Sequence, residues 1–530
     1  MTTIQKTLSK KELEEAIIQE KMKGVSDVEI GRKYGISFKY LEKIITRTQG
    51  ISISSLKQEK KIKTFYPKDF KEETTTVWSF KQRGNWATHS GEYRGNWSPY
   101  ITRNLILKYS KPGSLVLDYF CGAGTTAVEC KLLGRRCIAF DINDKAIELA
   151  KRNLNFEPAE QLKISNSNEK LEIFEPHLFV GDARDLSFLK DNSVDLICSH
   201  PPYANAIHYT ARKEGDLSFC DVDEFLEEMS KVAKESYRVL KPGSLCAILI
   251  GDIRRKKHVI PLGFKLIDVF LNTGFKLKEL IIKRQHNCKT TGFWYEKSIK
   301  YNFLLLAHEY LPVFEKPEKL ETSVVKEIHN DYHMVLPKIS NTKIKKKLEK
   351  LETTTVWIFP EKDFDERLNK NIIERYSQEG NYSIINLFAS SGSILEIQSK
   401  LRKKQTKNKY DLIIVKACVK DKSSGFEPED YLKSFKKIIE GLLPELKDKG
   451  FLVIQTNDVR INGYLEPLAQ KIVNLLTNKN LWLKEIVVVT TSKVQEETVE
   501  GPQKVVDFLG CPIDHLKIIH EYLLVYEVLK

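Results

Sequence analysis

The stretch VDLICSHPPY, residues 194–203, decides how the rest of the chain is interpreted. Its first part, residues 194–198, is apolar except for Asp195 and has the length expected for a buried strand. Pro201 and Pro202 end that strand and keep the backbone open, because proline cannot donate to a sheet ladder. An aromatic residue, Tyr203, follows at once. A rigid turn at the carboxyl end of a strand is the place where α/β enzymes carry reacting groups.

Such a turn can hold an exocyclic amino group. A proline carbonyl accepts one amino hydrogen and a neighbouring polar side chain accepts the other. The nitrogen lone pair, otherwise delocalised into a base ring, then becomes localised and nucleophilic, while the aromatic residue stacks on the base. The alternative is an ordinary Pro-Pro loop with a packing tyrosine. We assign five residues to the expected catalytic turn: Ser199, His200, Pro201, Pro202 and Tyr203.

A second stretch, LVLDYFCGAGTT at residues 115–126, predicts an apolar strand that runs into a glycine turn and a helix. Glycines let a backbone approach a ligand closely, although many nucleotide-binding proteins share this pattern. The next expected strand ends in Asp141, which follows Asp118 at close to the roughly 20-residue offset where a carboxylate binds ribose hydroxyls. A third strand ends in Asp182, an acid suited to an adenine amino group.

Together the two stretches resemble the amino-group DNA methyltransferases, which methylate adenine N6 or cytosine N4 with S-adenosyl-L-methionine. The cofactor loop of that family, Asp-Pro-Phe-x-Gly-x-Gly-Thr-Thr, is matched by residues 118–126, except that Tyr119 replaces the proline. Its catalytic motif, Asp, Asn or Ser before Pro-Pro and an aromatic, is matched at residues 201–203. Residues 89–112 resemble the helix on the cofactor side, and the whole resemblance covers about residues 72–315.

The resemblance implies a Rossmann-like α/β methyltransferase fold that binds S-adenosyl-L-methionine. Carried over residue by residue, it implies these cofactor contacts: Asp118, Tyr119, Phe120, Gly122, Gly124, Thr125, Asp141 and Asp182.

His200 departs from the family pattern, which has Asp, Asn or Ser at this position. A neutral imidazole can accept one hydrogen bond, whereas a protonated imidazole can accept none. We therefore expect activity to fall as the pH drops through the ordinary histidine range, about 6 to 7. Ser199 is the alternative acceptor. Because His200 departs from the family motif, the choice between cytosine N4 and adenine N6 as the methylated group stays open. Residues 204–209 are similar to those of cytosine-type members and favour cytosine slightly.

Length and composition place further bounds. A chain of 530 residues should hold roughly two to four domains. A net charge of +14 favours a polyanionic partner, or reflects a lysine-rich composition from an AT-rich genome. Nine scattered cysteines without a Cys-x-x-Cys pair indicate reduced thiols and no zinc knuckle. Without an apolar leader or a run near 18 apolar residues, we expect a cytoplasmic protein without membrane segments.

Residues 1–50 predict a helix-turn-helix module that binds DNA. Helices are expected at 10–23, 26–34 and 38–48, with a glycine turn at 35–37 between the last two. The alternative is a three-helix bundle that binds protein. The residues expected to face DNA are Ser37, Lys39, Tyr40 and Lys43.

Residues 51–70 predict a linker, and residues 71–315 the catalytic domain. Within that domain we expect an antiparallel hairpin between residues 277–282 and 301–308, joined by a mobile loop at 283–300. Basic residues of this loop are expected to contact DNA: Arg284, His286 and Lys289.

The C-terminal part repeats the catalytic domain. Three motifs recur in the same order: ETTTVW at 73–78 and 352–357, DIR at 252–254 with DVR at 458–460, and HEYL at 308–311 and 520–523. Three ordered matches predict a duplicated domain at residues 351–530, with residues 316–350 as a charged tether.

The second copy lacks the residues for chemistry. Residues 386–393, NLFASSGS, replace the glycine loop and lose its acid and one glycine. Residues 415–419, VKACV, replace the catalytic turn and hold nothing that could polarise an amino group. We expect an inactive lobe that packs on the active one and helps to bind DNA, so that the monomer acts as an internal pseudo-dimer.

The expected protein is therefore two tandem methyltransferase lobes, one active and one degenerate, with a small all-α module. It would methylate an exocyclic amino group of a base flipped out of double-stranded DNA, in restriction-modification, with or without a restriction partner, or in epigenetic marking. One alternative is an RNA guanine-N2 methyltransferase, since such tRNA enzymes also use an acid-Pro-Pro-Tyr turn. Another is a catalytically silent DNA-binding regulator.

Overall fold

The computed structural model describes residues 9–22, 25, 27–37, 40–41, 44, 62–68, 70–91, 93–158, 163–164, 170–204, 208–210, 213–286, 291–318, 348–390, 393–403, 409–419, 425–476, 480–492, 505–506 and 515–529. Lys39, Lys43 and Lys289 lie outside these residues, as do most of the helix expected at 38–48, of the linker and of the tether.

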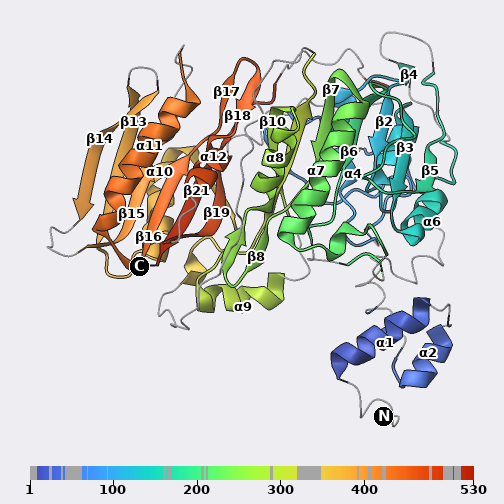
Figure 1. Ribbon diagram of the computed structural model, residues 1–530, viewed down its shortest axis with the longest axis horizontal. Coiled ribbons are helices and arrows are strands. Elements are labelled where there is room, and N and C mark those ends of the chain that lie inside the picture. Colours follow the sequence, from blue (N-terminus) through green and yellow to red (C-terminus); the bar gives the residue numbers. More distant parts are fainter. Residues whose placement is uncertain are drawn as a thin grey trace.

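The first lobe is built on an eight-stranded sheet in the order β1-β10-β11-β7-β6-β2-β3-β5 (Figure 1). Strands β5, β3, β2, β6 and β7 run parallel, and β11 lies antiparallel between β7 and β10. The strands are β1 (Val77–Ser79), β2 (Leu115–Asp118), β3 (Arg136–Asp141), β5 (His177–Val180), β6 (Val194–Ser199), β7 (Leu240–Ile248), β10 (Lys276–Arg284) and β11 (His308–Glu315). The expected α/β architecture is confirmed.

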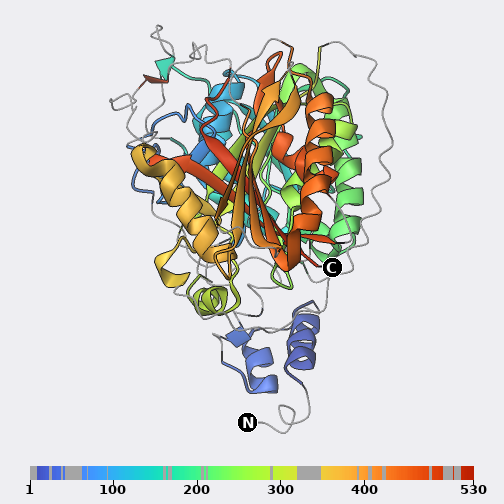
Figure 2. The ribbon, with the colours of Figure 1, turned by 90° about the vertical axis from the view of Figure 1, so that its left-hand side faces the viewer.

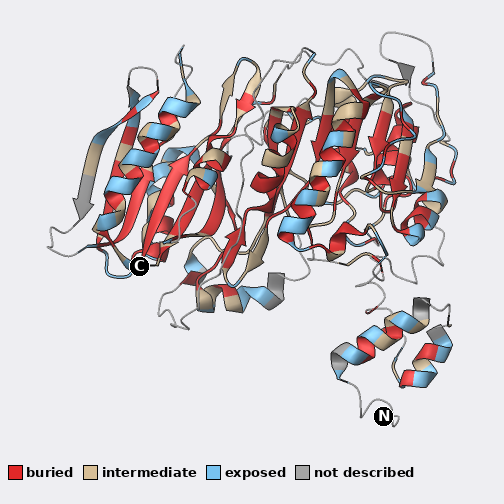
Figure 3. Cartoon of the chain, in the orientation of Figure 1, coloured by how far each residue is buried: buried red, intermediate tan, exposed pale blue. Residues whose placement is uncertain are grey.

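Helices cover both faces of this sheet, as the apolar runs of parallel strands require. They are α4 (Pro99–Tyr109), α5 (Thr125–Leu132), α6 (Asp144–Asn153), α7 (Val222–Val239) and α8 (Leu262–Asn272). Figure 2 shows helical layers on either side of the strands, and Figure 3 shows that the central strands are the most buried part. The parallel order brings the carboxyl ends of β2, β3, β5 and β6 to one edge, where the two sequence motifs meet.

The hairpin expected after residue 276 is wrong in its second strand. Strand β10 pairs with residues 308–315, from Arg284 opposite His308 to Lys276 opposite Glu315. The expected loop instead contains helix α9 (Thr291–Tyr301). The reason is tertiary: residues 308–314 are buried because β11 is enclosed between two neighbouring strands.

The second lobe repeats this sheet in shortened form, with the order β12-β19-β21-β16-β15-β13-β14. Its strands are β12 (Val356–Phe359), β13 (Tyr382–Ser390), β14 (Ile394–Lys403), β15 (Tyr410–Lys416), β16 (Leu446–Thr456), β19 (Leu481–Thr491) and β21 (His520–Val528). Its helices are α10 (Phe364–Tyr376), α11 (Pro428–Leu442) and α12 (Leu468–Leu475). The first six strands of this order correspond to β1, β10, β11, β7, β6 and β2.

The difference between the lobes lies where the cofactor loop would be. In the first lobe β2 leads through glycines into α5 and then to the parallel strand β3. In the second lobe β13 turns directly into β14, which pairs with it antiparallel. Among the described residues of the second lobe, an antiparallel strand pair thus stands where the first lobe has its glycine turn and helix.

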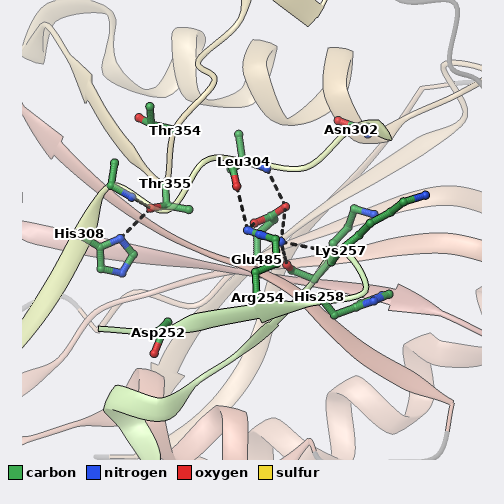
Figure 4. Close-up of polar contacts among 12 residues, drawn as sticks. Asp252, Arg254, Lys257, His258, Asn302, Leu304, His308, Thr354, Thr355 and Glu485 are labelled. Atoms are coloured by element: carbon green, nitrogen blue, oxygen red, sulfur yellow. Dashed lines mark hydrogen bonds and ion pairs between the residues drawn. The ribbon is translucent and has the colours of Figure 1, made fainter. Parts of the chain in front are cut away.

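The two lobes contact each other through pairs of equivalent residues. Arg254, in hairpin β8 (Ile253–Arg255) and β9 (His258–Ile260), pairs with Glu485 of the second lobe (Figure 4). The equivalent Arg460, in hairpin β17 (Val459–Ile461) and β18 (Tyr464–Glu466), pairs with Glu279 of the first lobe at 2.6 Å. In Figure 1, β17 and β18 lie at the top and β8 at the bottom of the region where the lobes meet. With the two reciprocal Arg–Glu pairs, this gives the contact approximate two-fold symmetry.

Breaking one of these pairs should destabilise the whole chain. The Glu485 side chain is fully buried and accepts hydrogen bonds from Arg254 and from the Leu304 backbone N–H at 3.0 Å. Arg254→Met leaves a buried carboxylate without its counter-ion, and we expect the free energy of unfolding to fall by about 3–5 kcal/mol in urea denaturation. Lys145→Met, which breaks the exposed pair with Glu148, is the control and should change it by less than about 1 kcal/mol. Equal losses in both variants would contradict this role.

The N-terminal module forms a separate small core. Helices α1 (Lys10–Met22) and α2 (Asp27–Tyr34) pack through Leu13, Ile17, Ile30 and Tyr34, and Leu41 and Ile44 complete this core. Gly35 adopts φ +63° in the turn that follows α2, as the expected glycine turn requires. The Ser37 hydroxyl accepts a hydrogen bond from the Tyr40 backbone N–H at 3.2 Å, which is the geometry of a helix cap.

Candidate active site

Two cavities meet at the turn of residues 199–203, at the carboxyl edge of the first sheet. The first cavity lies over the glycine loop and is lined by Phe120, Gly122, Asp141, Asp182, His200 and Pro202, among others. The second, of about 490 Å³, is lined by Pro201, Tyr203, Lys283, Arg284, His286 and Glu309, among others. Five residues line both cavities: Gly95, Asn96, Trp97, His200 and Tyr209.

Asp118 organises the loop from within. Its buried carboxylate accepts hydrogen bonds from Thr126 Oγ1 at 2.6 Å, Ser199 Oγ at 2.8 Å and the Phe120 backbone N–H at 3.1 Å. Burial raises the pKa of Asp118 to about 6, although these bonds oppose the shift. Asp118 therefore shapes the wall of the first cavity and does not line it.

The same contacts correct the expectation for Ser199. Its side chain is fully buried, donates to Asp118 and accepts from the Phe120 backbone N–H at 3.1 Å. It lines neither cavity, so its hydroxyl ties the two motifs together and does not reach a base. Of the two alternatives for the amino-group acceptor, only His200 faces the cavities.

The glycine loop leaves no room for larger residues. Gly122 and Gly124 adopt φ +50° and +80°, where a side chain is strained. A Cβ at Gly122 would lie 2.8 Å from the Tyr93 ring, and one at Gly124 would lie 3.0 Å from the Ala150 Cβ. Thr125 donates from Oγ1 to Asn96 Oδ1 at 2.8 Å, which ties the loop to a residue that lines both cavities.

Asp141 stands at the end of β3 and lines the first cavity. Its two carboxylate oxygens accept the backbone N–H groups of Gly122 and Asn143, each at 2.9 Å. These bonds use one acceptor site on each oxygen and leave others for hydroxyl groups. Burial raises the pKa of Asp141 to about 7, and the two backbone hydrogen bonds offset part of that rise.

Asp182 lines the same cavity, but its carboxylate is already paired. Arg184 donates to it from Nε at 3.0 and 3.1 Å and from Nη2 at 2.6 Å, and also pairs with Glu228. An adenine amino group would therefore share this acid with a guanidinium. Tyr119 and Phe120 both line this cavity, while the Tyr119 hydroxyl is buried 3.0 Å from Ser236 Oγ.

His200 belongs to a chain of polar contacts that leads away from the turn. Its Nε2 lies 2.8 Å from the Tyr203 hydroxyl, which donates to Glu309 Oε1 at 2.7 Å. Lys283 Nζ holds the other oxygen of Glu309 at 2.7 Å. Burial of Glu309 is outweighed by Lys283 and its neighbours, which lower the pKa of Glu309 to about 2. The carboxylate is therefore ionised and anchors Tyr203.

The pH dependence expected for His200 needs correction. Burial lowers the pKa of His200 to about 4, and the charge of Glu309 offsets only part of that shift. The ring is thus neutral at and above pH 5 and keeps an unprotonated nitrogen. Its loss of acceptor capacity moves from the ordinary histidine range to about pH 4.

The segment that carries Asn96 and Trp97 is fixed by two hydrogen-bond networks, a half-buried one around Arg83 and a buried one around Glu129. Arg83 donates to the carbonyls of Asn96 at 2.5 Å and Trp97 at 2.6 Å. Glu129, on α5, accepts from Trp86 Nε1 at 2.7 Å and pairs with His89 and Arg103. The Trp97 ring then stacks on His200 with centroids 5.9 Å apart.

Sequence reasoning missed several residues of the site. Asn96, Trp97 and Tyr209 line both cavities, and Lys283 and Glu309 line the second. The repeated HEYL motif was a usable signal for Glu309, but the repeat alone does not show which side chain faces the turn. Of the expected DNA contacts, Arg284 and His286 line the second cavity, and His286 Nε2 lies 2.9 Å from Ser79 Oγ.

Comparison with known proteins agrees with this geometry. A family model described as DNA methylase, of the N6/N4 methyltransferase type, matches residues 19–152 and 194–408, and a methyltransferase-domain model matches residues 117–248. The type II methyltransferase M.MthZI of Methanothermobacter thermautotrophicus is 26% identical over 318 residues, which cover 56% of this chain and 82% of that protein. The type II methyltransferase M.MjaI of Methanocaldococcus jannaschii is 22% identical, over 47% of this chain and 93% of that protein.

Solved structures show weaker likeness. A methyltransferase from Methanosarcina mazei that uses S-adenosyl-L-methionine is 16% identical and covers 41% of this chain and 98% of its own, with a TM-score of 0.28.

A glycine loop beneath a cavity, with a Pro-Pro-Tyr turn beside it, defines an α/β methyltransferase. The chain belongs to the N6/N4 family of DNA methylases, whose cofactor is S-adenosyl-L-methionine. The tight glycine cradle and the open acceptor sites of Asp141 fit that cofactor. Among the described residues, no helix is long and apolar enough to cross a membrane.

Proposed function

We propose that the protein methylates an exocyclic amino group of a base flipped out of double-stranded DNA, with cytosine N4 as the first target to test and adenine N6 as the second. One observation carries the proposal: two cavities, one over the glycine loop and one lined by basic residues, meet at His200. An amino group inside a duplex is out of reach, so the base must leave the stack.

The chain's residues would orient the base and exclude water. The Pro201 carbonyl and the unprotonated nitrogen of His200 would accept the two amino hydrogens and so localise the nitrogen lone pair. The Tyr203 ring would stack on the base, held by Glu309 through its hydroxyl. Bound S-adenosyl-L-methionine supplies an electrophilic methyl group. Because that methyl is already reactive, orientation would contribute most of the rate enhancement.

DNA would be held by two basic regions. Lys81, Lys283, Arg284 and His286 line the second cavity and can reach phosphates near the flipped base. The N-terminal module would contact the duplex through Ser37, Lys39, Tyr40 and Lys43, with Ser37 acting through its cap. The second lobe would take the place of a partner subunit, so that one chain acts as an internal pseudo-dimer. A role in restriction-modification follows the type II relatives.

One relative favours a second candidate function. A tRNA (guanine(10)-N2)-dimethyltransferase of Methanothermobacter thermautotrophicus is 32% identical over 126 residues, which cover 24% of this chain and 33% of that protein. That match is confined to a smaller share of both proteins than the matches to the two type II enzymes. We therefore rank RNA guanine-N2 methylation second.

Nucleoside analysis separates these functions. The protein is expressed in a host without other DNA methylation, and DNA and RNA are digested and analysed by mass spectrometry beside a Tyr203→Ala control. We expect N4-methylcytosine or N6-methyladenine in DNA, absent from the control. N2-methylguanine in RNA, without a methylated base in DNA, would show that the protein is an RNA methyltransferase. No methylated base in either nucleic acid would favour a silent DNA-binding regulator.

The acid limb of the pH profile distinguishes Asp141 from His200. As the pH falls through about 7, Asp141 gains a proton, and S-adenosyl-L-methionine binding should weaken because the neutral acid is a poorer acceptor for ribose hydroxyls. At saturating cofactor, kcat should stay level down to about pH 5, because His200 remains neutral until about pH 4. A limb in kcat near pH 6 to 7 that disappears in His200→Asn would show that His200 titrates in its ordinary range.

A further inference from the structure

The second lobe holds the segment that leads directly into Glu309. The Leu304 backbone N–H donates to Glu485 Oε1 at 3.0 Å, and the Leu305 N–H donates to the Thr353 carbonyl at 2.9 Å. Leu305 in turn accepts from the Thr355 N–H at 2.9 Å. Three successive contacts from the inactive lobe thus fix the chain just before β11.

The Thr355 side chain adds two further contacts to this segment. Its hydroxyl accepts the Ala307 backbone N–H at 3.0 Å and lies 2.8 Å from His308 Nδ1 (Figure 4). The ring of His308 continues through Nε2 to the Tyr310 hydroxyl at 3.0 Å, which donates to Asp252. His308 is therefore held at both nitrogens, and the buried Thr355 is one of its two anchors.

Glu309 follows His308 in β11 and points to the opposite face of the sheet, because successive side chains of a strand alternate between its faces. It reaches the catalytic turn through the Tyr203 hydroxyl at 2.7 Å. A shift of His308 would move Glu309 with it, and the Tyr203 ring would lose its fixed position.

We propose that Thr355, in the lobe without catalytic residues, is a positioning residue for the catalytic turn, acting through His308, Glu309 and Tyr203. The inactive lobe then contributes to methyl transfer itself and not only to stability or DNA binding. This inference rests on the proposed function of the turn.

The duplication supplies a matched control. Thr76 occupies the equivalent position in the first lobe: its hydroxyl accepts the Ile519 N–H at 3.3 Å and lies 2.9 Å from His520 Nδ1. His520 likewise continues to the Tyr522 hydroxyl, at 2.9 Å. The next residue, Glu521, however, accepts from Gln455 at 2.6 Å and lies beside Cys418, in a segment that lacks the Pro-Pro-Tyr of the catalytic turn. Loss of either hydroxyl should cost similar stability, and only one should affect catalysis.

The test compares Thr355→Val, Thr355→Ser and Thr76→Val in the full-length protein. Valine removes both contacts of the hydroxyl, with the Ala307 N–H and with His308 Nδ1. We expect Thr355→Val to lower kcat by about tenfold or more, with the affinity for S-adenosyl-L-methionine unchanged. Thr355→Ser restores the hydroxyl and should bring kcat to within about twofold of the wild type. Thr76→Val should lower the melting temperature as much as Thr355→Val while leaving kcat within about twofold.

Equal losses of kcat in the two valine variants would overturn the inference, as would an unchanged kcat in Thr355→Val or no recovery in Thr355→Ser. NMR of the histidine imidazoles separates failure of this inference from failure of the proposed function. The His200 signal, assigned with His200→Asn, should shift in Thr355→Val and stay in place in Thr76→Val. If the wild type methylates no nucleic acid, the proposed function fails, but the shift of the His200 signal still tests whether Thr355 positions the turn. No shift of that signal in Thr355→Val would overturn the positioning role, whatever the activity of the wild type.

Discussion

Replacing Asp141 by alanine should weaken S-adenosyl-L-methionine binding by about 100-fold or more, because hydrogen bonds from ribose hydroxyls to a buried carboxylate contribute about 1.5–3 kcal/mol each. The change also leaves the backbone N–H groups of Gly122 and Asn143 without acceptors inside the fold. The loop would then lose its shape as well as its ligand contacts. Titration calorimetry measures the effect directly and gives the stoichiometry.

Glu148→Gln is the matched control, because Glu148 is an exposed acid on the helix that follows Asp141. It should leave the affinity unchanged. We expect one site per wild-type chain, since the hairpin β13–β14 stands where the second lobe would need its glycine turn. Binding of wild-type strength in Asp141→Ala would show that Asp141 does not hold the cofactor. Two sites per chain, or binding that persists when Asp118 and Asp141 are both replaced, would show that the second lobe binds the cofactor too.

Tyr203→Ala should lower kcat by about 100- to 1000-fold. The stacking of one base on an aromatic ring contributes about 1–3 kcal/mol, and the hydrogen bond that orients His200 is lost in addition. Cofactor binding should stay within about twofold, because Tyr203 lines only the second cavity. Single-turnover methylation of DNA at saturating cofactor is the measurement.

Tyr203→Phe divides that effect into its two parts. Phenylalanine keeps the stacking ring and removes the hydroxyl that Glu309 and His200 contact. We expect a loss of about tenfold, the lower range for a hydrogen bond to a charged group. If Tyr203→Ala methylates DNA as fast as Tyr203→Phe does, the ring does not stack on the base.

The local motifs of the first lobe were predictable because each depends on short-range geometry. The two prolines end β6 at Ser199, and the glycines turn the chain into α5, as the sequence pattern indicated. The acids at 118 and 141 follow from the same strand–turn–helix unit. The duplication was predictable too, because its three motifs mark equivalent points of two sheets.

Other features depended on contacts between distant segments. The sequence could not show that the Ser199 hydroxyl would donate its hydrogen bond to Asp118, since 81 residues separate them and only the sheet brings them together. Nor could it show that burial would lower the pKa of His200 to about 4, which results from the surrounding walls and from no neighbour in sequence.

By itself, the sequence determined the strand ends, the glycine turn and the repeat, since these follow from the backbone preferences of proline and glycine and from the apolar pattern of each segment. Only the tertiary structure decided which side chains face the cavities and which hold the fold. It also placed Thr355 of the second lobe against His308 of the first one. The physical reason is that burial and hydrogen-bond partners arise from packing between elements far apart in the chain.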